Sequence, residues 1–206
     1  MKAPSQSTEE RIREAARKVF MAKGYDGTTS RDIAEASGLN VAMTNYYFRS
    51  KEKLFQLTFE DFHRKFFAKM NSIINEDIPL RKKVSLMIDH EYEMVEQNPD
   101  LPMFVMYEMR RNPNLFPELP PKSLSKHAFI VRQVKEAIAK GEMKPIAPMQ
   151  LMLLITSNVQ HPFMARSIVS HAFRLSESEF AALVGKHKQT VKDMLLTYLF
   201  GPEKED

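Results

Sequence analysis

Apolar residues recur at helical spacing along almost the whole of this 206-residue chain. This pattern constrains the fold more than any other feature, because apolar residues three and four positions apart form one stripe along an α-helix. No segment shows the period-two alternation or the Val, Ile and Thr density that is typical of a strand. The sequence therefore predicts an all-α protein of about nine helices.

Glycines, prolines and capping side chains divide this pattern into separate helices. Gly24 can end the first helix, and Pro79, Asn98-Pro99, Gly141, Pro145 and Pro148 mark later breaks. The residues that can cap helix N-termini are Ser7 (with Glu10 as a capping box), Thr29, Asn40 and Ser50. The predicted helices span 8–23, 30–37, 41–47, 51–75, 79–97, 101–111, 123–140, 147–171 and 177–200.

Three short helices come first and longer ones come after them. This order predicts a small N-terminal domain, residues 1–54, and a larger helical domain, residues 55–206. The second and third helices have the features of a helix-turn-helix. Ala34 is small where two helices must cross closely, and Gly38 permits the positive φ of a tight turn. In this geometry the third helix lies in the DNA major groove.

Charge and composition favour the same class of protein. The net charge is +4, and up to Lys53 there are ten Lys or Arg residues against seven Asp or Glu. An N-terminal quarter that carries most of the excess is expected if it meets a polyanion. Because cysteine is absent and no long apolar segment occurs, we expect a cytoplasmic protein without disulfides or membrane spans.

The sequence does not favour an enzyme, a metal site or a bound cofactor. Six histidines are scattered without a His-x-x-x-His pair, and no Gly-rich phosphate loop or Gly-x-Ser-x-Gly motif occurs. His90 and Glu93 share a helix face, but such a pair without further ligands is typical of a surface.

The stretch GYDGTTSRDIAEASGLNVAMTNYYFRSKEKLF, residues 24–55, resembles the N-terminal domain of TetR/AcrR-family transcriptional regulators. The shared features are a Thr-rich turn, an Asp-Ile-Ala helix, a Ser-Gly turn, and an aromatic pair before Phe and a Lys-Glu-x-Leu helix start. The third helix, which would read the bases in the major groove and is called the reading helix below, is similar to that of a family subset with the pattern Asn-x-Ala-x-x-Asn-Tyr-x-Phe. Tyr47 stands where that subset has His.

The resemblance implies a set of DNA contacts. Phosphates would be held by Asn45, Tyr46, Tyr47 and Lys51, and on the flanking strand by Thr29, Ser30 and Arg31. Asn40 starts the reading helix, and base edges would be left to Val41, Ala42, Met43 and Thr44. These side chains can contact thymine methyl groups but form few hydrogen bonds, so DNA shape should contribute to specificity. Tyr47 can instead pack in the core, and Arg13 and Arg17 are typical of surface charge.

For residues 55–206 the resemblance implies effector binding and dimerisation. Flexible Met side chains suit an adaptable pocket, although Met at helical spacing also fills ordinary cores. The predicted effector-binding residues are Met94, Met103, Phe104, Tyr107, Met152, Asn158 and His161. The last two predicted helices, 147–171 and 177–200, would form a four-helix bundle with a second copy. Part of the apolar set on these helices must pack on the protein's own core, and the rest would form the interface. The set is Leu151, Leu154, Ile155, Val159, Phe180, Leu183, Val184, Val191, Leu195 and Tyr198.

Two functions are compatible with these expectations. The first is a homodimeric DNA-binding repressor that a small molecule releases from its operator. The second is a helical ligand-carrier or interaction protein that does not bind DNA. Salt-dependent DNA binding separates the two.

Overall fold

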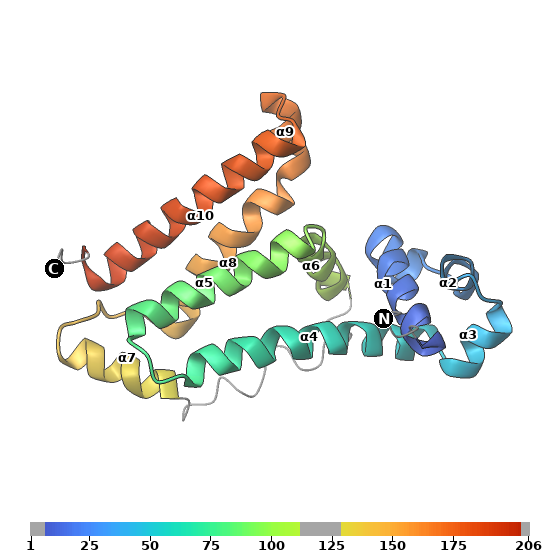
Figure 1. The fold of residues 1–206 in the computed structure, drawn as a ribbon, viewed down its shortest axis with the longest axis horizontal. Coiled ribbons are helices and arrows are strands. Elements are labelled where there is room, and N and C mark those ends of the chain that lie inside the picture. The colour runs from blue at the N-terminus through green and yellow to red at the C-terminus, as the bar shows by residue number, and fades with distance from the viewer. Residues whose placement is uncertain (1–6, 112–128, 203–206) are drawn as a thin grey trace, which may run out of the picture. The chain divides into compact units, whose positions relative to one another are not determined.

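The computed structural model describes residues 7–111 and 129–202, which form ten α-helices and no strand (Figure 1). The prediction of an all-α fold is confirmed. The helices are α1 (Thr8–Gly27), α2 (Ser30–Ser37), α3 (Val41–Tyr47), α4 (Lys51–Asn75), α5 (Leu80–Gln97), α6 (Leu101–Arg111), α7 (Phe129–Ala139), α8 (Pro148–Met164), α9 (Arg166–Phe173) and α10 (Glu177–Phe200). Within the described ranges, no helix is both long and apolar enough to cross a membrane.

Helix capping agrees closely with the sequence. The capping box of Ser7 and Glu10 is present, and the Asn40 side chain accepts a hydrogen bond from the Met43 N–H. Thr29 forms a further box with Asp32, and the Ser50 hydroxyl accepts from the Lys53 N–H at 3.1 Å. These local bonds satisfy N–H groups that the helix itself leaves without partners, so they set where α1 to α4 begin.

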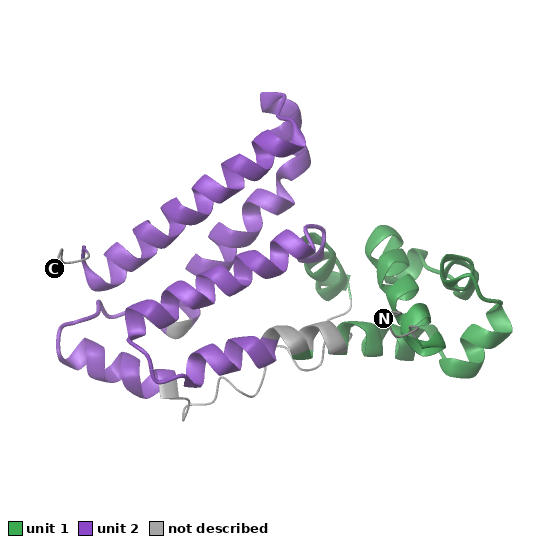
Figure 2. Cartoon of the chain, in the orientation of Figure 1, with its two compact units in different colours: residues 1–66, 103–119 green, residues 67–102, 120–206 purple. Residues whose placement is uncertain are grey.

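The chain divides into two compact units (Figure 2). Unit 1 comprises residues 1–66 and 103–119, and unit 2 comprises residues 67–102 and 120–206. The first part of α4 and most of α6 therefore belong to the same unit as α1 to α3. The functional boundary that we place between residues 54 and 55 stays a prediction.

Aromatic rings form the core of unit 1. Phe20 meets Phe55 edge to face with 5.0 Å between ring centroids, and Phe55 lies 4.7 Å from Phe59. Phe104 of α6 stacks on Phe59 at 4.8 Å. Because such rings bury large apolar areas, this cluster joins α1, α4 and α6 firmly.

In unit 2, α5 packs against both α8 and α10. The buried face of α5 contributes to one apolar core together with residues of α8 and α10, Ala137 of α7 and Met143. The buried members of that core are Val84, Ile88, Tyr92, Val95, Ala137, Met143, Ile155, Val159, Phe163, Phe180, Val184, Val191, Leu195 and Leu199.

The single helix predicted over 147–171 is wrong: the structure has two helices, α8 and α9, that meet at Ala165. Pro162 lies inside α8 and has no N–H for the Asn158 carbonyl, which lies 3.0 Å from His187 Nε2 instead. The helix ends two residues later, at Met164. The start of the helix predicted over 123–140 falls outside the described residues, and α7 is described from Phe129.

Glu91 of α5 is a buried carboxyl group, 7% exposed, that accepts a hydrogen bond from Gln160 of α8 at 3.1 Å. Burial raises its pKa to about 7, against 4.5 for an exposed Glu. The unfolded chain therefore loses this proton at a lower pH than the folded chain. The Glu91 contribution to stability is complete below pH 4.5, falls as the pH rises towards 7, and stays low above it.

We expect Glu91→Gln to remove this pH dependence, because Gln keeps an acceptor oxygen for Gln160 and cannot ionise. At pH 8 the variant should be more stable than the wild type by on the order of 3 kcal/mol, and at pH 4 the two should differ little. Urea unfolding at fixed protein concentration measures the difference. The free energy of unfolding should change more between pH 4 and pH 8 in the wild type than in the variant. Equal changes in the two proteins would contradict this assignment.

Candidate nucleic-acid interface

Helices α2 and α3 form a helix-turn-helix around Gly38. This glycine ends α2 with φ 66° and ψ 27°, a conformation that other residues rarely adopt. The Leu39 N–H donates to the Ala34 carbonyl at 2.9 Å, and Arg11 of α1 donates to the Ser37 carbonyl at 2.8 Å. The C-terminus of α2 is thus closed by the turn and by a cation at its negative end.

The two faces of α3 differ sharply. Thr44 is 3% exposed and its hydroxyl bonds the Asn40 carbonyl, so it does not face solvent with the other residues predicted to meet bases. The reason is helical spacing, since Thr44 and the buried Phe48 lie one turn apart on the inner face. The accessible side carries Ala42, Met43, Asn45 and Tyr46, while Val41 is half-buried.

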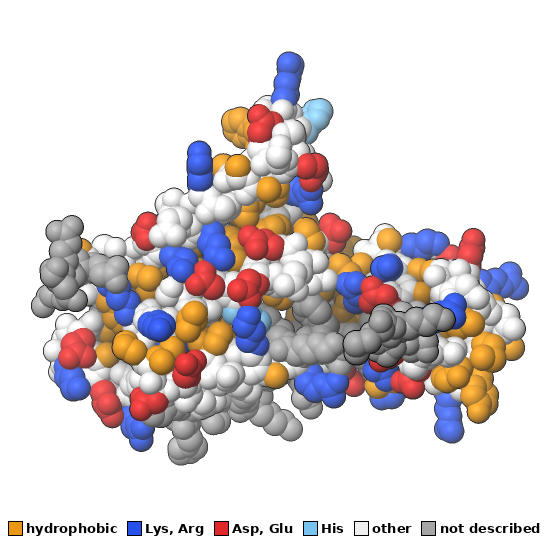
Figure 3. Space-filling view, viewed as in Figure 1, with side chains coloured by type: hydrophobic (Ala, Val, Ile, Leu, Met, Phe, Trp, Pro, Cys, Tyr) orange, Lys and Arg blue, Asp and Glu red, His pale blue; other side chains and the backbone are white. Residues whose placement is uncertain are grey.

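Tyr46 and Tyr47 form an edge-to-face pair with 5.4 Å between ring centroids. Tyr46 is 81% exposed and Tyr47 is 39% exposed, so Phe48 rather than Tyr47 is the aromatic residue of the core. Hydrophobic side chains gather with Lys and Arg over the α3 end of unit 1 (Figure 3). Large exposed rings with hydroxyl groups suit a surface that contacts DNA phosphates.

Lys51 has a structural role that the sequence did not reveal. Its ammonium donates to the carbonyl oxygens of Tyr25 at 2.9 Å and Thr28 at 3.0 Å, and it lies 4.4 Å from the Tyr25 ring centre. An ammonium group has three donors, so these two bonds use most of its capacity. Gly24 kinks α1, so residues 24–28 form a separate turn between the main part of α1 and α2. The Lys51 contact to phosphate stays a prediction, and the structure adds that Lys51 holds this Gly24–Thr28 turn.

Helix α6 also contacts this turn. Glu108 is 1% exposed and accepts the Tyr25 N–H at 2.8 Å, although 83 residues separate the two. Gly24 has φ 71°, and a Cβ there would lie 3.0 Å from Glu108 Oε1. Arg111 of α6 forms an ion pair with Asp26. No local sequence signal predicts these contacts.

The start of α2 presents a mixed surface. Thr29 and Arg31 are exposed and Ser30 is half-buried. Lys23 pairs with Asp32 at 2.6 Å, and this partner together with the Thr29 hydroxyl and N–H holds the pKa of Asp32 well below its usual range. Asp32 is therefore ionised at neutral pH, and the DNA contacts of Thr29, Ser30 and Arg31 stay predictions.

The predicted effector-binding residues do not fall in one compact unit. Met103, Phe104 and Tyr107 belong to unit 1, whereas the other four belong to unit 2. Phe104 is part of the aromatic core, while Met103, Tyr107, Met152 and His161 are exposed and Met94 and Asn158 are half-buried. The Asn158 amide donates to the Leu154 carbonyl at 2.7 Å within its own helix. The effector set stays a prediction.

The region with this geometry matches a known family. Residues 12–58 match the family described as bacterial regulatory proteins, tetR family. These residues form a TetR-family DNA-binding domain. The resemblance stated for residues 24–55 is confirmed at the level of the family, and the proteins that the chain matches are regulators of transcription.

Relatives extend the likeness beyond the TetR-family domain. The chain is 25% identical to the HTH-type transcriptional regulator UidR of Escherichia coli K12, over 70% of this chain and 74% of UidR. It is 23% identical to the HTH-type transcriptional repressor KstR2 of Mycolicibacterium smegmatis, over 69% of this chain and 71% of KstR2.

A solved structure shows the same fold. The regulator FadR of Bacillus subtilis, in complex with stearoyl-CoA, superposes with a TM-score of 0.61 and 19% identity, over 91% of this chain and 97% of that one. The chain is a DNA-binding regulator of transcription, and residues 12–58 are the part that matches the tetR family.

We expect Lys51→Met to destabilise the TetR-family domain by about 2 kcal/mol, because it removes two hydrogen bonds from a charged group to carbonyls of the turn. Thermal and urea unfolding measure the loss. Lys53→Met is the matched control, since Lys53 is exposed on the same helix turn. Equal stability of the two variants would show that the Lys51 contacts contribute nothing.

Proposed function

We propose that the chain is a homodimeric repressor that binds its operator with one α3 helix from each subunit and is released by a small molecule bound within residues 55–206. The accessible face of α3, with Met43, Asn45 and Tyr46 outward and Thr44 inward, is the observation that supports this best. A dimer would place its two reading helices about 34 Å apart, which is one turn of DNA.

The side chains on that face support a division of tasks. Tyr46 and Asn45 have donors for phosphate oxygens, and so would fix position without reading sequence. Val41, Ala42 and Met43 have only apolar atoms for the bases, and so would contact thymine methyl groups. We also propose that α3 belongs to the subset with the pattern Asn-x-Ala-x-x-Asn-Tyr-x-Phe, with Tyr47 in place of His.

Exposed apolar residues on α8 and α10 support dimerisation. Met149, Met152 and Leu153 share one face of α8, and Leu183, Met194 and Tyr198 share one face of α10. All six are between 43% and 61% exposed. Apolar side chains in this number, on two neighbouring helices, suit the four-helix bundle of a symmetric dimer.

Most of the interface residues predicted from the sequence do not lie on these exposed faces of α8 and α10. Leu183 and Tyr198 are exposed, whereas Leu151 and Leu154 are half-buried. The remaining predicted residues are buried within this chain: Ile155, Val159, Phe180, Val184, Val191 and Leu195. These six are the part of the set that packs on the protein's own core, and the sequence did not identify them because helical periodicity marks an apolar stripe without saying which partner covers it.

The contacts of α6 suggest how a ligand could act on DNA binding. Glu108 and Arg111 hold the Gly24–Thr28 turn, and Thr29 caps α2 directly after it. A ligand that favours another position of α6 would disturb this turn and with it the start of the helix-turn-helix. Such a ligand lowers operator affinity only by as much as its own affinities for the two states differ.

We expect Tyr46→Phe and Met43→Ala to weaken DNA binding in different ways. Tyr46→Phe removes a hydroxyl that can donate a hydrogen bond to a DNA phosphate. It should therefore reduce affinity by a similar factor for the DNA upstream of the protein's own gene (the upstream DNA) and for random DNA. Met43→Ala should reduce affinity mainly for the specific site. Fluorescence anisotropy on both duplexes at several salt concentrations measures the two effects. An equal loss on both duplexes for Met43→Ala would rule out Met43 as a residue that reads bases.

The same titration of the wild type separates the two candidate functions. A repressor shows salt-dependent binding to its upstream DNA. A ligand carrier without DNA binding shows no binding below micromolar concentrations at any salt.

We expect the double variant Leu153→Glu and Met194→Glu to be monomeric, because two buried charges per subunit in the bundle would lack partners. Sedimentation velocity measures the mass, and circular dichroism checks that the helices remain. Lys135→Glu, at an exposed position of α7, is the control and should stay dimeric. A dimer that persists in the double variant would place the interface elsewhere.

A further inference from the structure

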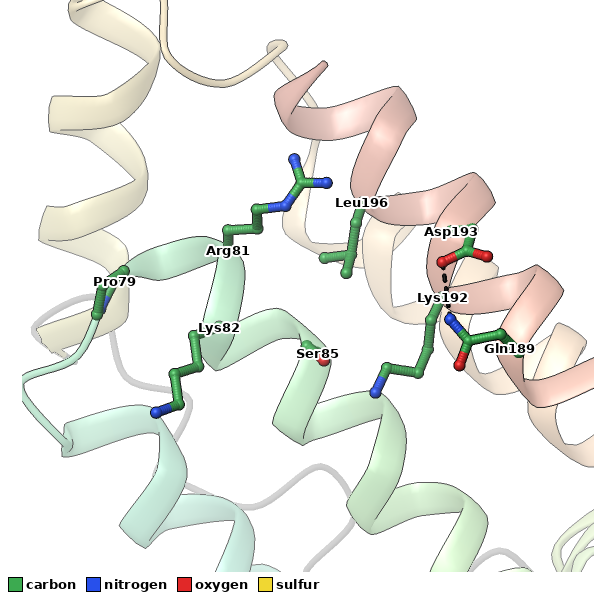
Figure 4. Close-up of a pocket in the computed structure, with 8 residues that line it drawn as sticks. All are labelled: Pro79, Arg81, Lys82, Ser85, Gln189, Lys192, Asp193 and Leu196. Carbon is green, nitrogen blue, oxygen red and sulfur yellow. Dashed lines mark hydrogen bonds between the residues drawn. The ribbon is translucent and has the colours of Figure 1, made fainter. Parts of the chain in front are cut away.

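A cavity of about 390 Å³ lies between the first turns of α5 and the C-terminal half of α10, within unit 2 (Figure 4). Its lining residues are Pro79, Arg81, Lys82, Ser85, Gln189, Lys192, Asp193 and Leu196. None of them belongs to the predicted effector or DNA-binding sets. A volume of this size falls within the range of about 300–1,000 Å³ that is usual for small-molecule sites.

The charges around this cavity are mostly positive. Arg81 and Lys82 of α5 and Lys192 of α10 are among the lining residues, with their charged ends pointing in different directions (Figure 4), and Asp193 is the one acid in this lining. The Asp193 carboxylate accepts a hydrogen bond from Gln189 at 2.9 Å. Cations gathered around a concave surface with low-dielectric walls concentrate positive potential there.

Contacts outside the cavity fix two of the three cations. Lys192 lies 2.8 Å from Asp89, and Lys188 lies 3.2 Å from the same carboxylate. One acid is thus shared by two ammonium groups, which leaves a surplus of positive charge. Arg81 donates to the Gly201 carbonyl at 2.8 Å, and this bond holds its side chain beside the end of α10.

Hydrogen-bond donors accompany the charge. Ser85 lies one turn after Arg81 and Lys82 on α5, so its hydroxyl shares their side of the helix. Helix α5 begins at Leu80 after Pro79, and no side chain caps its N-terminus. Donors from several directions match an anion with three acceptor oxygens better than a flat carboxylate.

We propose that this cavity binds the phosphate group of a small phosphorylated metabolite. The cavity is much larger than one ion, and Pro79 and Leu196 give it an apolar wall for an organic body. The lining residues of α10 point away from the proposed dimer face, because they lie on another side of the helix from Leu183, Met194 and Tyr198. The site would therefore stay accessible in a dimer, and it does not depend on the proposed repressor function.

Phenyl phosphate and benzoate test the proposal on the full chain. They share an aromatic body and differ in the acidic group. We expect phenyl phosphate to raise the melting temperature saturably, and inorganic phosphate to do so more weakly. Benzoate and sodium chloride at equal ionic strength should have no saturable effect. A response to phenyl phosphate no greater than the response to chloride overturns the proposal.

Variants locate the binding. Lys82→Gln and Lys192→Gln should each weaken phenyl phosphate binding about tenfold in calorimetric titrations, because each removes a charge-assisted hydrogen bond. Lys82 is exposed, and Lys188 still pairs with Asp89 when Lys192 is replaced, so both variants should fold. Lys186→Gln, on α10 but outside the lining, is the control and should bind like the wild type.

Two results would overturn the assignment at this stage. The first is unchanged affinity in Lys82→Gln. The second is that a short DNA duplex displaces phenyl phosphate from the wild type and does not bind to Lys82→Gln. That result would mean that the cavity contacts the phosphates of nucleic acid.

Discussion

The hydrogen bonds of the Tyr25 peptide group hold the turn that precedes the helix-turn-helix of unit 1. The Tyr25 N–H donates to the buried carboxylate of Glu108, and the Tyr25 carbonyl accepts from Lys51. The conformation of Gly24, with φ 71°, lets the chain leave the main part of α1 at this position. Two charged side chains from distant parts of the sequence thus fix one turn, and each would lose a partner inside the protein if the turn moved.

The helix-turn-helix comes directly after this turn along the chain. Thr28 donates to the Gly24 carbonyl at 2.7 Å, and Thr29 begins α2 as its N-cap. Ala34 and Gly38 then set the close passage from α2 to α3. The segments that connect this turn to α2 and α2 to α3 are short and hydrogen-bonded. A displacement of the turn would therefore also displace α3 and its exposed face. In the function that we propose, a ligand would act on α3 through this connection.

The sequence predicts local features of this protein well and distant contacts poorly. Capping by Ser7, Asn40 and Ser50 was predictable because a cap and its partner lie within three residues. The helix-turn-helix was predictable for the same reason. The Glu108 contact could not be predicted, because its partner is 83 residues away and the residues around it carry no matching signal.

Other differences have the same origin. An apolar stripe on α8 or α10 looks alike in sequence whether it meets its own core, as Val159 and Val191 do, or remains exposed, as Met194 does. Lys51 looked like an ordinary cation beside DNA, yet most of its donors serve the fold.

The affinity of Glu108→Met for the upstream DNA tests the central claim most directly. Met is similar in size to Glu but offers the Tyr25 N–H no strong acceptor, so the turn should loosen while the aromatic core keeps unit 1 folded. We expect the dissociation constant, measured by fluorescence anisotropy on protein whose circular dichroism matches the wild type, to rise at least about tenfold. An unchanged dissociation constant would contradict the account, because it would mean that α3 is positioned without the contact between Glu108 and Tyr25.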